Sequence, residues 1–447
     1  MHRRDLLRTV AAGGITALGI GAVDTVAAAD SQLEPGTWYD ATVTDVTDGD
    51  TIDVTLDSDG TDYEIRVLGV DTPETKRNGK YESIPEWEGI EDDKHLTSWG
   101  ENAKDYAQSL FPDGTAVQIA VDAEEDEVDP YGRLLAYIRY DSTGDGTYDT
   151  LYNRDLIEQG YARVYGSSLT QHDDFWQAEH DAQSAGAGVW GQSDPANTSE
   201  VDDDPVSELF FPKVSSVRTD AGAIDPARVP VFAESSAYQQ LDGGVSYSQI
   251  PLVGLDEGAN VAMVGGLSID ESFEDQAVGQ HEVFLTNLVD YLSSKSGQLL
   301  IDGGHGQFNA DNALSNEDAV HYQRYLEGQG IAFEQVNTLD GQGDNALSTA
   351  RGIVITNPPQ AFTTSEVDAL SSFVSNGGAV LLLGSALASS TARSNLDALA
   401  ADLGSDLRLN GDQVFDDQHN AGSGRGDSSL VTTGNVDASF PLFDPYS

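Results

Sequence analysis

The sequence predicts a multidomain protein in which a small β-barrel with helices (α+β) is followed by an α/β parallel-sheet domain. Three observations lead to this prediction. Short strand-like runs dominate the first part, strands and helices alternate in the last part, and a stretch rich in Pro, Ser, Asn and Asp separates them. A chain of 447 residues is long enough for two or three domains. We place the first domain at 37–192, a linker at 193–208 and the second domain at 209–447.

The first domain is expected to contain five strands and three helices. Alternating apolar and polar residues indicate strands in WYDATVTDVT, TIDVTLDS, DYEIRVLGV, TAVQIAVD and GRLLAYIRYD. A helix is predicted over SWGENAKDYAQSLF, with Ser98 and Glu101 as a capping box. A shorter helix is predicted over NRDLIEQG with Asn153 as its cap, and a third over DDFWQAEHDAQSAGAGVWG. Five strands with helices inserted and appended favour a closed barrel of the OB type.

The second domain shows regular alternation of the two element types. GQLLIDGG, IAFEQV, GIVIT and AVLLLGS are typical of strands, and SNEDAVHYQRYLEGQG, TSEVDALSSFVSNGG and RSNLDALAADLG are typical of helices. Strands that are apolar throughout are buried on both faces. The pattern therefore predicts a parallel sheet covered by helices on each side.

The charge of the chain is extreme. Asp and Glu number 76 against 22 Lys and Arg, which gives a net charge of −54. Such a surface repels itself in dilute buffer, and about 1 M salt screens most of that repulsion. We therefore expect a protein from a halophile, in which an isolated acidic cluster is weak evidence of function. The absence of cysteine excludes disulfides, thiolate metal sites and cysteine nucleophiles.

Residues 1–29 resemble a twin-arginine export signal. Arg3 and Arg4 precede a short apolar run rich in Gly and Ala, and three alanines follow at 27–29. The apolar run, 9–23, is too short for a membrane span. We expect cleavage after Ala29, no stable span afterwards, and a secreted protein that is released or held at the cell surface.

Three short motifs in the first domain contain the residues suited to catalysis: DGDT at 48–51, RVLGVDTPET at 66–75 and DPYGR at 129–133. Asp50 and Asp71 are hard oxygen ligands that suit Ca²⁺ together with a backbone carbonyl and waters. Glu74 offers a further carboxylate, and Arg66 and Arg133 offer guanidinium groups that match phosphate oxygens. These are the parts needed to hydrolyse a phosphodiester.

The motifs, taken in order, resemble the staphylococcal nuclease (thermonuclease) family. The resemblance runs from Trp38 to Gly191 and includes DGDT, VDTPET followed by KRNGK, WGENAK, DPYGRLLAYI, LYNRDLIEQGYARVY and GVWG. It implies calcium-dependent cleavage of DNA and RNA that leaves 3′-phosphate ends.

The resemblance also implies a role for each matching residue. The metal ligands would be the carboxylates of Asp50 and Asp71 and the backbone carbonyl of Thr72, with Asp48 in the outer shell. The catalytic residues would be Glu74 as general base and Arg66 and Arg133 on the phosphate. Tyr131 would contact a phosphate. Either Tyr165 stacks on a base one residue earlier than in the family, or base stacking is weaker in this chain.

Several of these residues have a simpler explanation. Acidic residues are common in this chain, whereas arginine is scarce, so two arginines at the required positions discriminate better than the acids do. Lys76 and Arg77 either contact phosphate or balance nearby acids. The stretch 80–96 looks like an insertion near the site, and we favour a solvated loop over a lid.

The second domain resembles the class I glutamine-amidotransferase-like α/β fold through FVSNGGAVLLLGS. The amidotransferase nucleophile is a cysteine, and this chain has none. We therefore interpret the domain as a binding or protein-interaction module with an unknown partner.

Two functions are consistent with the sequence. One is a secreted, Ca²⁺-dependent, sugar-nonspecific endonuclease acting on DNA and RNA. The other is a non-catalytic nucleic-acid- or protein-binding module on an OB-type scaffold that has lost catalysis. The first is favoured because Asp50, Asp71, Glu74, Arg66 and Arg133 are all present.

Overall fold

The computed structural model describes residues 33–75, 84–197, 204–340, 346–422 and 426–446, and the chain divides into two compact units. The first unit extends to Ile84, resumes at Asp92 and ends at Ser193. The second contains Pro85–Glu91 and everything from Asp194 onward. The expected export signal, 1–29, and Lys76 and Arg77 lie outside the described residues.

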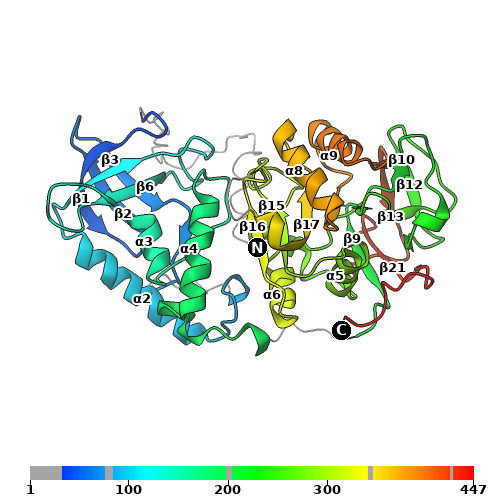
Figure 1. The fold of residues 1–447 in the computed structure, drawn as a ribbon, viewed down its shortest axis with the longest axis horizontal. Helices are drawn as coiled ribbons and strands as arrows, with labels where there is room; N and C mark the ends of the chain where they lie inside the picture. Colours follow the sequence, from blue (N-terminus) through cyan, green and yellow to red (C-terminus); the bar gives the residue numbers. More distant parts are fainter. Residues whose placement is uncertain (1–32, 76–83, 198–203, 341–345, 423–425, 447) are drawn as a thin grey trace, which may run out of the picture. The chain divides into compact units, whose positions relative to one another are not determined.

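The first unit is built on a closed barrel (Figure 1). The strands are β1 (Tyr39–Val46), β2 (Thr51–Leu56), β3 (Asp62–Val67), β5 (Ala116–Ala120) and β6 (Leu134–Tyr140), in the order β3-β2-β1-β5-β6. Strand β3 also pairs with β6, in parallel, and this closes the sheet on itself. Apolar residues at alternate positions fill the interior, and the OB-type barrel is confirmed. The short strand β7 (Thr150–Leu151) pairs antiparallel with the end of β6, and β4 (Val70–Asp71) pairs with β8 (Arg163–Val164).

The three expected helices are present, but two of their starts were predicted wrongly. They are α2 (Asp93–Leu110), α3 (Tyr152–Glu158) and α4 (His172–Ala185). Ser98 is not a cap: α2 begins earlier, and Asp92 caps it by accepting a hydrogen bond from Lys94 N. Asn153 lies inside α3 and is fully buried, where its side chain bonds to Ile138 N and Leu68 O. The asparagine thus joins the helix to the barrel, a tertiary role that local pattern cannot indicate.

The insertion at 80–96 is not a solvated loop where it is described, so that prediction was wrong. Its last residues belong to the start of α2, and Pro85–Glu91 is part of the second unit. The side chain of Trp87 is fully buried.

The second unit contains a seven-stranded sheet in the order β11-β13-β14-β18-β17-β15-β16. Strands β14, β18, β17, β15 and β16 pair in parallel, whereas β11, β13 and β14 pair antiparallel, so the sheet is mixed. The bounds are β11 (Val231–Phe232), β13 (Pro251–Asp256), β14 (Val261–Val264), β15 (Gln298–Asp302), β16 (Phe333–Val336), β17 (Ala350–Thr356) and β18 (Ala379–Leu383).

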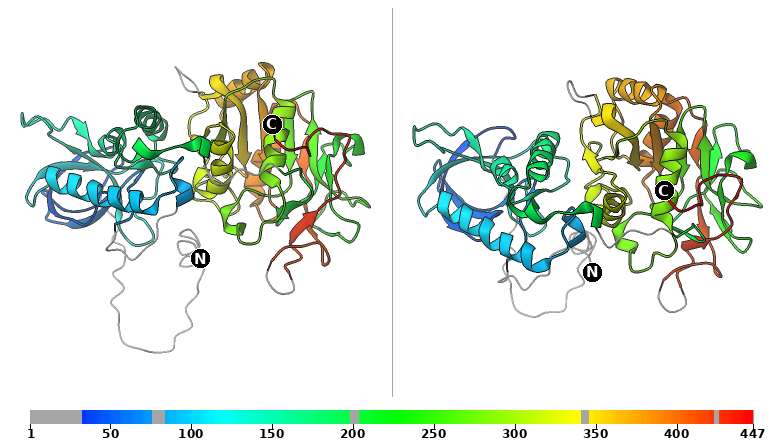
Figure 2. Two further views of the ribbon diagram at one scale, coloured as in Figure 1. Left: turned by 90° about the horizontal axis from the view of Figure 1, so that it is seen from below. Right: turned by 60° about the horizontal axis from the view of Figure 1, so that its bottom comes forward.

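Helices cover both faces of this sheet (Figure 2). Leu299 and Ile301 of β15 face one apolar core, and Leu300 between them faces the other. The first core includes side chains of α5 (His281–Leu292) and α6 (Val320–Gly328), and the second includes those of α8 (Thr364–Ser375) and α9 (Ser390–Asp402). The short helix α7 (Ala346–Thr349) precedes β17.

Three two-stranded ladders complete the second unit. They are β9 (Leu209–Pro212) with β21 (Leu430–Thr433), β10 (Val217–Thr219) with β19 (Leu407–Leu409), and β12 (Tyr238–Leu241) with β20 (Asp412–Phe415). Among the residues whose structure is described, no helix is both long and apolar enough to cross a membrane.

Candidate active site

The turn between β1 and β2 fixes the position of Asp50. The backbone carbonyl of Asp50 accepts a hydrogen bond from Val67 N, and this bond joins the turn to the end of β3. Its carboxylate accepts two more from Thr72, one from the backbone N at 2.9 Å and one from the hydroxyl at 3.0 Å. Gly49 is required beside it, because a Cβ there would lie 2.8 Å from side-chain carbons of both Thr72 and Ala103. Asp50 is therefore held by the end of β3 and by Thr72, while α2 packs closely against its neighbour Gly49.

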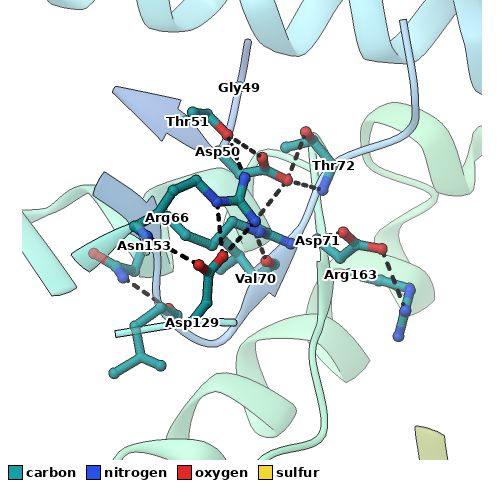
Figure 3. A network of polar contacts seen from close by, with 12 residues as sticks. Gly49, Asp50, Thr51, Arg66, Val70, Asp71, Thr72, Asp129, Asn153 and Arg163 are labelled. Atoms are coloured by element: carbon teal, nitrogen blue, oxygen red, sulfur yellow. Dashed lines mark hydrogen bonds and ion pairs between the residues drawn. The ribbon is translucent and has the colours of Figure 1, made fainter. Parts of the chain in front are cut away.

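Arg66 joins Asp50 to Asp71 at the centre of the site (Figure 3). Its Nη1 is 2.9 Å from Asp50 Oδ2, and its Nη2 is 2.8 Å from Asp71 Oδ1. Nη1 also donates to the carbonyl of Val70. The other oxygen of Asp71 lies 3.2 Å from Nη2 of Arg163, which comes from β8. Two buried carboxylates are thus bracketed by two arginines.

Arg133 lies beside the same turn and is oriented by Asp129. The Asp129 carboxylate accepts from Nε of Arg133 at 2.7 Å and approaches its Nη2 to 2.6 Å, while also accepting the backbone N–H of Arg133. Nη1 donates to the hydroxyl of Thr51, the residue that follows Asp50. The Arg133 side chain keeps 24% of its surface exposed, so it is both fixed and accessible.

Asp48 is the one carboxylate of this turn whose charge is poorly compensated. Its Oδ1 is buried without a hydrogen-bond partner. Burial, and then the nearby negative charge of Asp50, raise the pKa of Asp48 to about 7, although the charge of Arg66 opposes the shift. The turn therefore concentrates more negative charge than its surroundings neutralise.

The residues predicted as calcium ligands are brought together, but they do not form a complete set of ligands. Asp50 and Asp71 offer hard oxygens, and the buried, unpartnered oxygen of Asp48 fits a site suited to a cation. Within the described ranges, no three acidic, histidine or cysteine side chains converge as metal ligands. The guanidinium of Arg66 lies between the carboxylates of Asp50 and Asp71.

Glu74 follows the site on the turn after β4 and is half-buried. The backbone of this turn packs against α2 at Gly100, where a Cβ would lie 2.3 Å from the carbonyl oxygen of Pro73 and 2.9 Å from that of Glu74. A glycine is required in this helix because the turn that carries Glu74 rests directly on it.

The two tyrosines predicted to contact substrate lie beside arginines. Tyr131 is 62% exposed, and the guanidinium carbon of Arg133 is 5.6 Å from its ring centroid. Tyr165 is half-buried, with the guanidinium carbon of Arg163 at 5.7 Å from its ring. Nucleobases stack on flat aromatic rings, and a neighbouring guanidinium group can add a favourable cation–π contact.

Three residues of the site were not predicted from the sequence. Arg163 is only 4% exposed and pairs with Asp71, Asp129 orients Arg133, and the hydroxyl of Tyr152, fully buried, donates to Gly49 O. The scarcity of arginine, which favoured Arg66 and Arg133, applied equally to Arg163. Asp129 stands within the DPYGR motif and could have been identified as the partner of its arginine.

Comparisons with known proteins agree with this geometry. The profile of the family described as "Staphylococcal nuclease homologue" matches residues 64–192, a range that includes Arg66, Asp71, Glu74 and Arg133 but not Asp50. The uncharacterized protein MJ1439 of Methanocaldococcus jannaschii is 38% identical over 157 residues, which are 35% of this chain and 73% of that protein.

Two named nucleases are also similar. The thermonuclease of Staphylococcus hyicus is 28% identical over 147 residues, 32% of this chain and 72% of that enzyme. The SPbeta prophage-derived endonuclease YokF of Bacillus subtilis is 31% identical over 154 residues, 34% of this chain and 45% of that protein. These matches cover about a third of the chain. On the family match and the similarity that extends over most of the Methanocaldococcus protein, the chain belongs to the family of staphylococcal nuclease homologues.

Proposed function

We propose that this protein is a secreted, calcium-dependent, sugar-nonspecific endonuclease that hydrolyses DNA and RNA phosphodiesters to 3′-phosphate products. The observation that supports this most directly is the set of arginines around Asp50. Arg66 and Arg133 are each oriented by a carboxylate, Arg66 from β3 and Arg133 from the position just before β6, and these two strands pair with each other. Guanidinium groups held in this way match the oxygens of a phosphate better than mobile lysines would.

Charge stabilisation, activation of water and contact with the substrate each have candidate residues in the chain. Negative charge grows on the phosphoryl oxygens in the transition state, and Arg66 and Arg133 would stabilise it by donating N–H groups. Glu74 would take the proton from the attacking water, since it is the accessible carboxylate nearest in sequence to Asp71. Tyr131 and Tyr165 would contact the flanking nucleotides.

We propose that calcium binds at the same corner. Asp50, Asp71 and the carbonyl of Thr72 would hold it, with Asp48 in the outer shell. A bound calcium ion would supply positive charge and a hard Lewis acid next to the phosphoryl group. On this proposal Arg66 exchanges its two carboxylate partners for the substrate phosphate, because it cannot bridge Asp50 and Asp71 and also clamp a phosphate.

Export and salt adaptation belong to the proposal as well. The twin-arginine pattern in 1–29 supports secretion, and the net charge of −54 supports a working environment of molar salt. An extracellular nuclease would meet calcium and free nucleic acid there.

The test is digestion of plasmid DNA and of single-stranded RNA by the full chain in molar salt. We expect both substrates to be cut with added calcium and neither to be cut with a chelator in excess. Product ends should accept a labelled nucleotide from a polymerase only after phosphatase treatment, since a 3′-phosphate blocks extension. Cleavage that persists in chelator, or ends that extend without phosphatase, would contradict the mechanism.

A matched pair of variants distinguishes a specific role of Asp50 from the general effect of removing one negative charge. Asp50→Asn removes a buried carboxylate that holds Thr72 and Arg66, whereas Asp45→Asn removes an exposed one a few residues away in β1. We expect Asp50→Asn to lose calcium activation and Asp45→Asn to keep it. Equal activity in the two variants would mean that Asp50 is only part of the acidic surface.

A further inference from the structure

The second unit contains seven residues taken from the middle of the nuclease sequence. Pro85–Glu91 belongs to it, although the residues before and after this segment belong to the first unit. We call Pro85–Glu91 the anchored segment. It precedes Asp92, which caps α2, and it follows the Glu74 turn in the chain. Both neighbours of the anchored segment therefore lead back to the candidate active site.

Two charged side chains of α6 hold the anchored segment by its backbone. Arg324 donates from Nη1 to the carbonyl of Trp87 at 3.0 Å and from Nη2 to that of Ile90 at 2.7 Å. Glu327 accepts from the backbone N of Gly89 at 3.1 Å and pairs with Arg324 at 3.2 Å. The contacts thus reach three backbone groups of the segment, on Trp87, Gly89 and Ile90, rather than one side chain.

These contacts are deeply buried. Arg324 is 2% exposed, Glu327 is 3% exposed and Trp87 is fully buried. An arginine and a glutamate are rarely buried unless they are paired and hydrogen-bonded, because removing them from water is costly. Here their hydrogen bonds go to the anchored segment. The docked segment supplies backbone partners to both charged groups where they are shielded from water, so the arrangement favours the docked state.

The anchored segment is joined to the catalytic turn through α2. Asp92 starts this helix directly after Glu91, and Gly100, two turns later, packs against the carbonyl oxygens of Pro73 and Glu74. A Cβ at Gly100 would collide with these two carbonyl oxygens, so α2 and the Glu74 turn are packed as closely as their backbones allow. A displacement of the start of α2 would therefore also move the turn that carries Glu74.

We propose that the second unit positions the catalytic turn of the nuclease by holding the anchored segment through Arg324 and Glu327. This rests on the function proposed above and assigns the second unit a role in that same site. Arg324, Glu327 and Trp87 act as positioning residues, because they touch neither substrate nor the reacting atoms. When the segment is released, the Glu74 turn loses its fixed place and the chemical step slows, while phosphate binding by Arg66 and Arg133 remains.

The experiment compares the full chain with the double variant Arg324→Met/Glu327→Leu, which replaces the buried pair with apolar side chains of similar size. The first readout is amide hydrogen exchange of peptides covering 84–92, which needs no nuclease activity. The second is kcat and KM for digestion of DNA with calcium. We expect exchange in 84–92 to accelerate by about tenfold or more and kcat to fall by about tenfold, with KM within about twofold.

Two controls complete the design. Arg351→Met/Asp290→Leu removes another ion pair of the second unit, between β17 and α5, and should change neither readout. Glu327→Gln keeps an oxygen that accepts from Gly89 N and should retain most of the protection. Exchange in α8 reports whether the double variant is folded, and if α8 loses protection too, Trp87→Ala replaces it as the test variant.

The outcomes are distinguishable. Unchanged protection of 84–92 in a folded double variant would overturn the anchoring. Lost protection with an unchanged kcat would overturn the positioning of the catalytic turn. If the unaltered chain cuts no nucleic acid, the proposed function fails and the positioning role falls with it, and exchange still decides whether the segment is anchored.

Discussion

At the residue scale, the arginines of the site are oriented by carboxylates of unequal burial. Asp129 contacts Arg133 through both the side chain and the backbone N–H, which fixes the direction of the guanidinium while leaving part of it exposed. Arg66 and Arg163, by contrast, are engaged with Asp71 and largely buried. Arg133 is therefore the guanidinium that is most ready to meet a phosphate without rearrangement.

This difference gives a graded prediction. Arg133→Ala should lower kcat by about 10²–10³, the usual cost of removing one donor to a developing charge. Asp129→Asn should lower kcat less, since the guanidinium remains but its orientation is weakened. Steady-state digestion of DNA in calcium is the measurement, with Arg154→Ala, an exposed ion pair on α3, as the control that should retain full activity. If Asp129→Asn cost as much as Arg133→Ala, Asp129 would have a direct role.

His305 in the second unit gives a prediction about pH. Its Nδ1 is 3.0 Å from Asp302, and its Nε2 is 3.4 Å from Glu366 of α8. Burial alone would lower the pKa of His305, but these two carboxylates outweigh it and raise the pKa from 6.5 to about 10. The protonated histidine therefore stabilises the fold fully below pH 6.5, and this contribution declines as pH rises from 6.5 to 10.

Urea unfolding of the full chain from pH 6 to pH 10, followed by a probe in the second unit, checks this. Each unit of raised pKa corresponds to about 1.4 kcal/mol in the free energy of unfolding. His305→Gln should be less stable at pH 6 and should lose most of the decline toward pH 10. A variant with the same pH slope as the unaltered chain would show that other groups govern it.

The site residues that sequence could predict are those whose spacing within a motif is informative. Asp50, Asp71 and Arg66 fall in short motifs that fix their distance along the chain, and the structure brings them together. Arg163 is different, because it reaches Asp71 only through the β4–β8 ladder between distant segments. No local pattern encodes that pairing.

At the element scale, α2 shows where local signals mislead. Ser98 and Glu101 have the spacing of a capping box, yet Asp92 caps the helix and buried Leu96 extends its apolar face toward the N-terminus. The strands were easier to predict, since alternation in a half-buried barrel leaves a clear period of two. The anchored segment could not be predicted, because its partners Arg324 and Glu327 lie more than 230 residues away.

Helix α2 also offers a sharp test of packing. Gly100→Ala should gain about 1 kcal/mol from helix propensity, yet its Cβ would meet the carbonyl oxygen of Pro73 at 2.3 Å. We expect a net loss of stability and a lower kcat, because the turn that carries Glu74 must shift. Thermal unfolding and DNA digestion measure the two effects.

Ser98→Ala in the same helix is the control. Ser98 is exposed and lies within α2, so alanine should be neutral or slightly stabilising and should leave kcat unchanged. A more stable Gly100→Ala with full activity would mean that the turn yields to α2 without consequence for the site.

At the scale of the whole molecule, charge sets the conditions for stability. With a net charge of −54, self-repulsion acts over about 10 Å at 0.1 M salt and over about 3 Å at 1 M salt. We expect the melting temperature to rise steadily between these salt concentrations with either sodium or potassium chloride. A melting temperature that is independent of salt would contradict the proposed adaptation to molar salt.

The chain passes between the two units three times, at 84/85, at 91/92 and at 193/194. Two domains joined by a single linker can be separated by one protease cut, and each domain can be gained, lost or exchanged during evolution as one continuous piece of sequence. Here a cut after Ser193 would leave Pro85–Glu91 on the first fragment while its binding partners remained on the other. Each unit is therefore discontinuous in sequence, and moving either one into another protein would require Pro85–Glu91 to be moved or replaced as well.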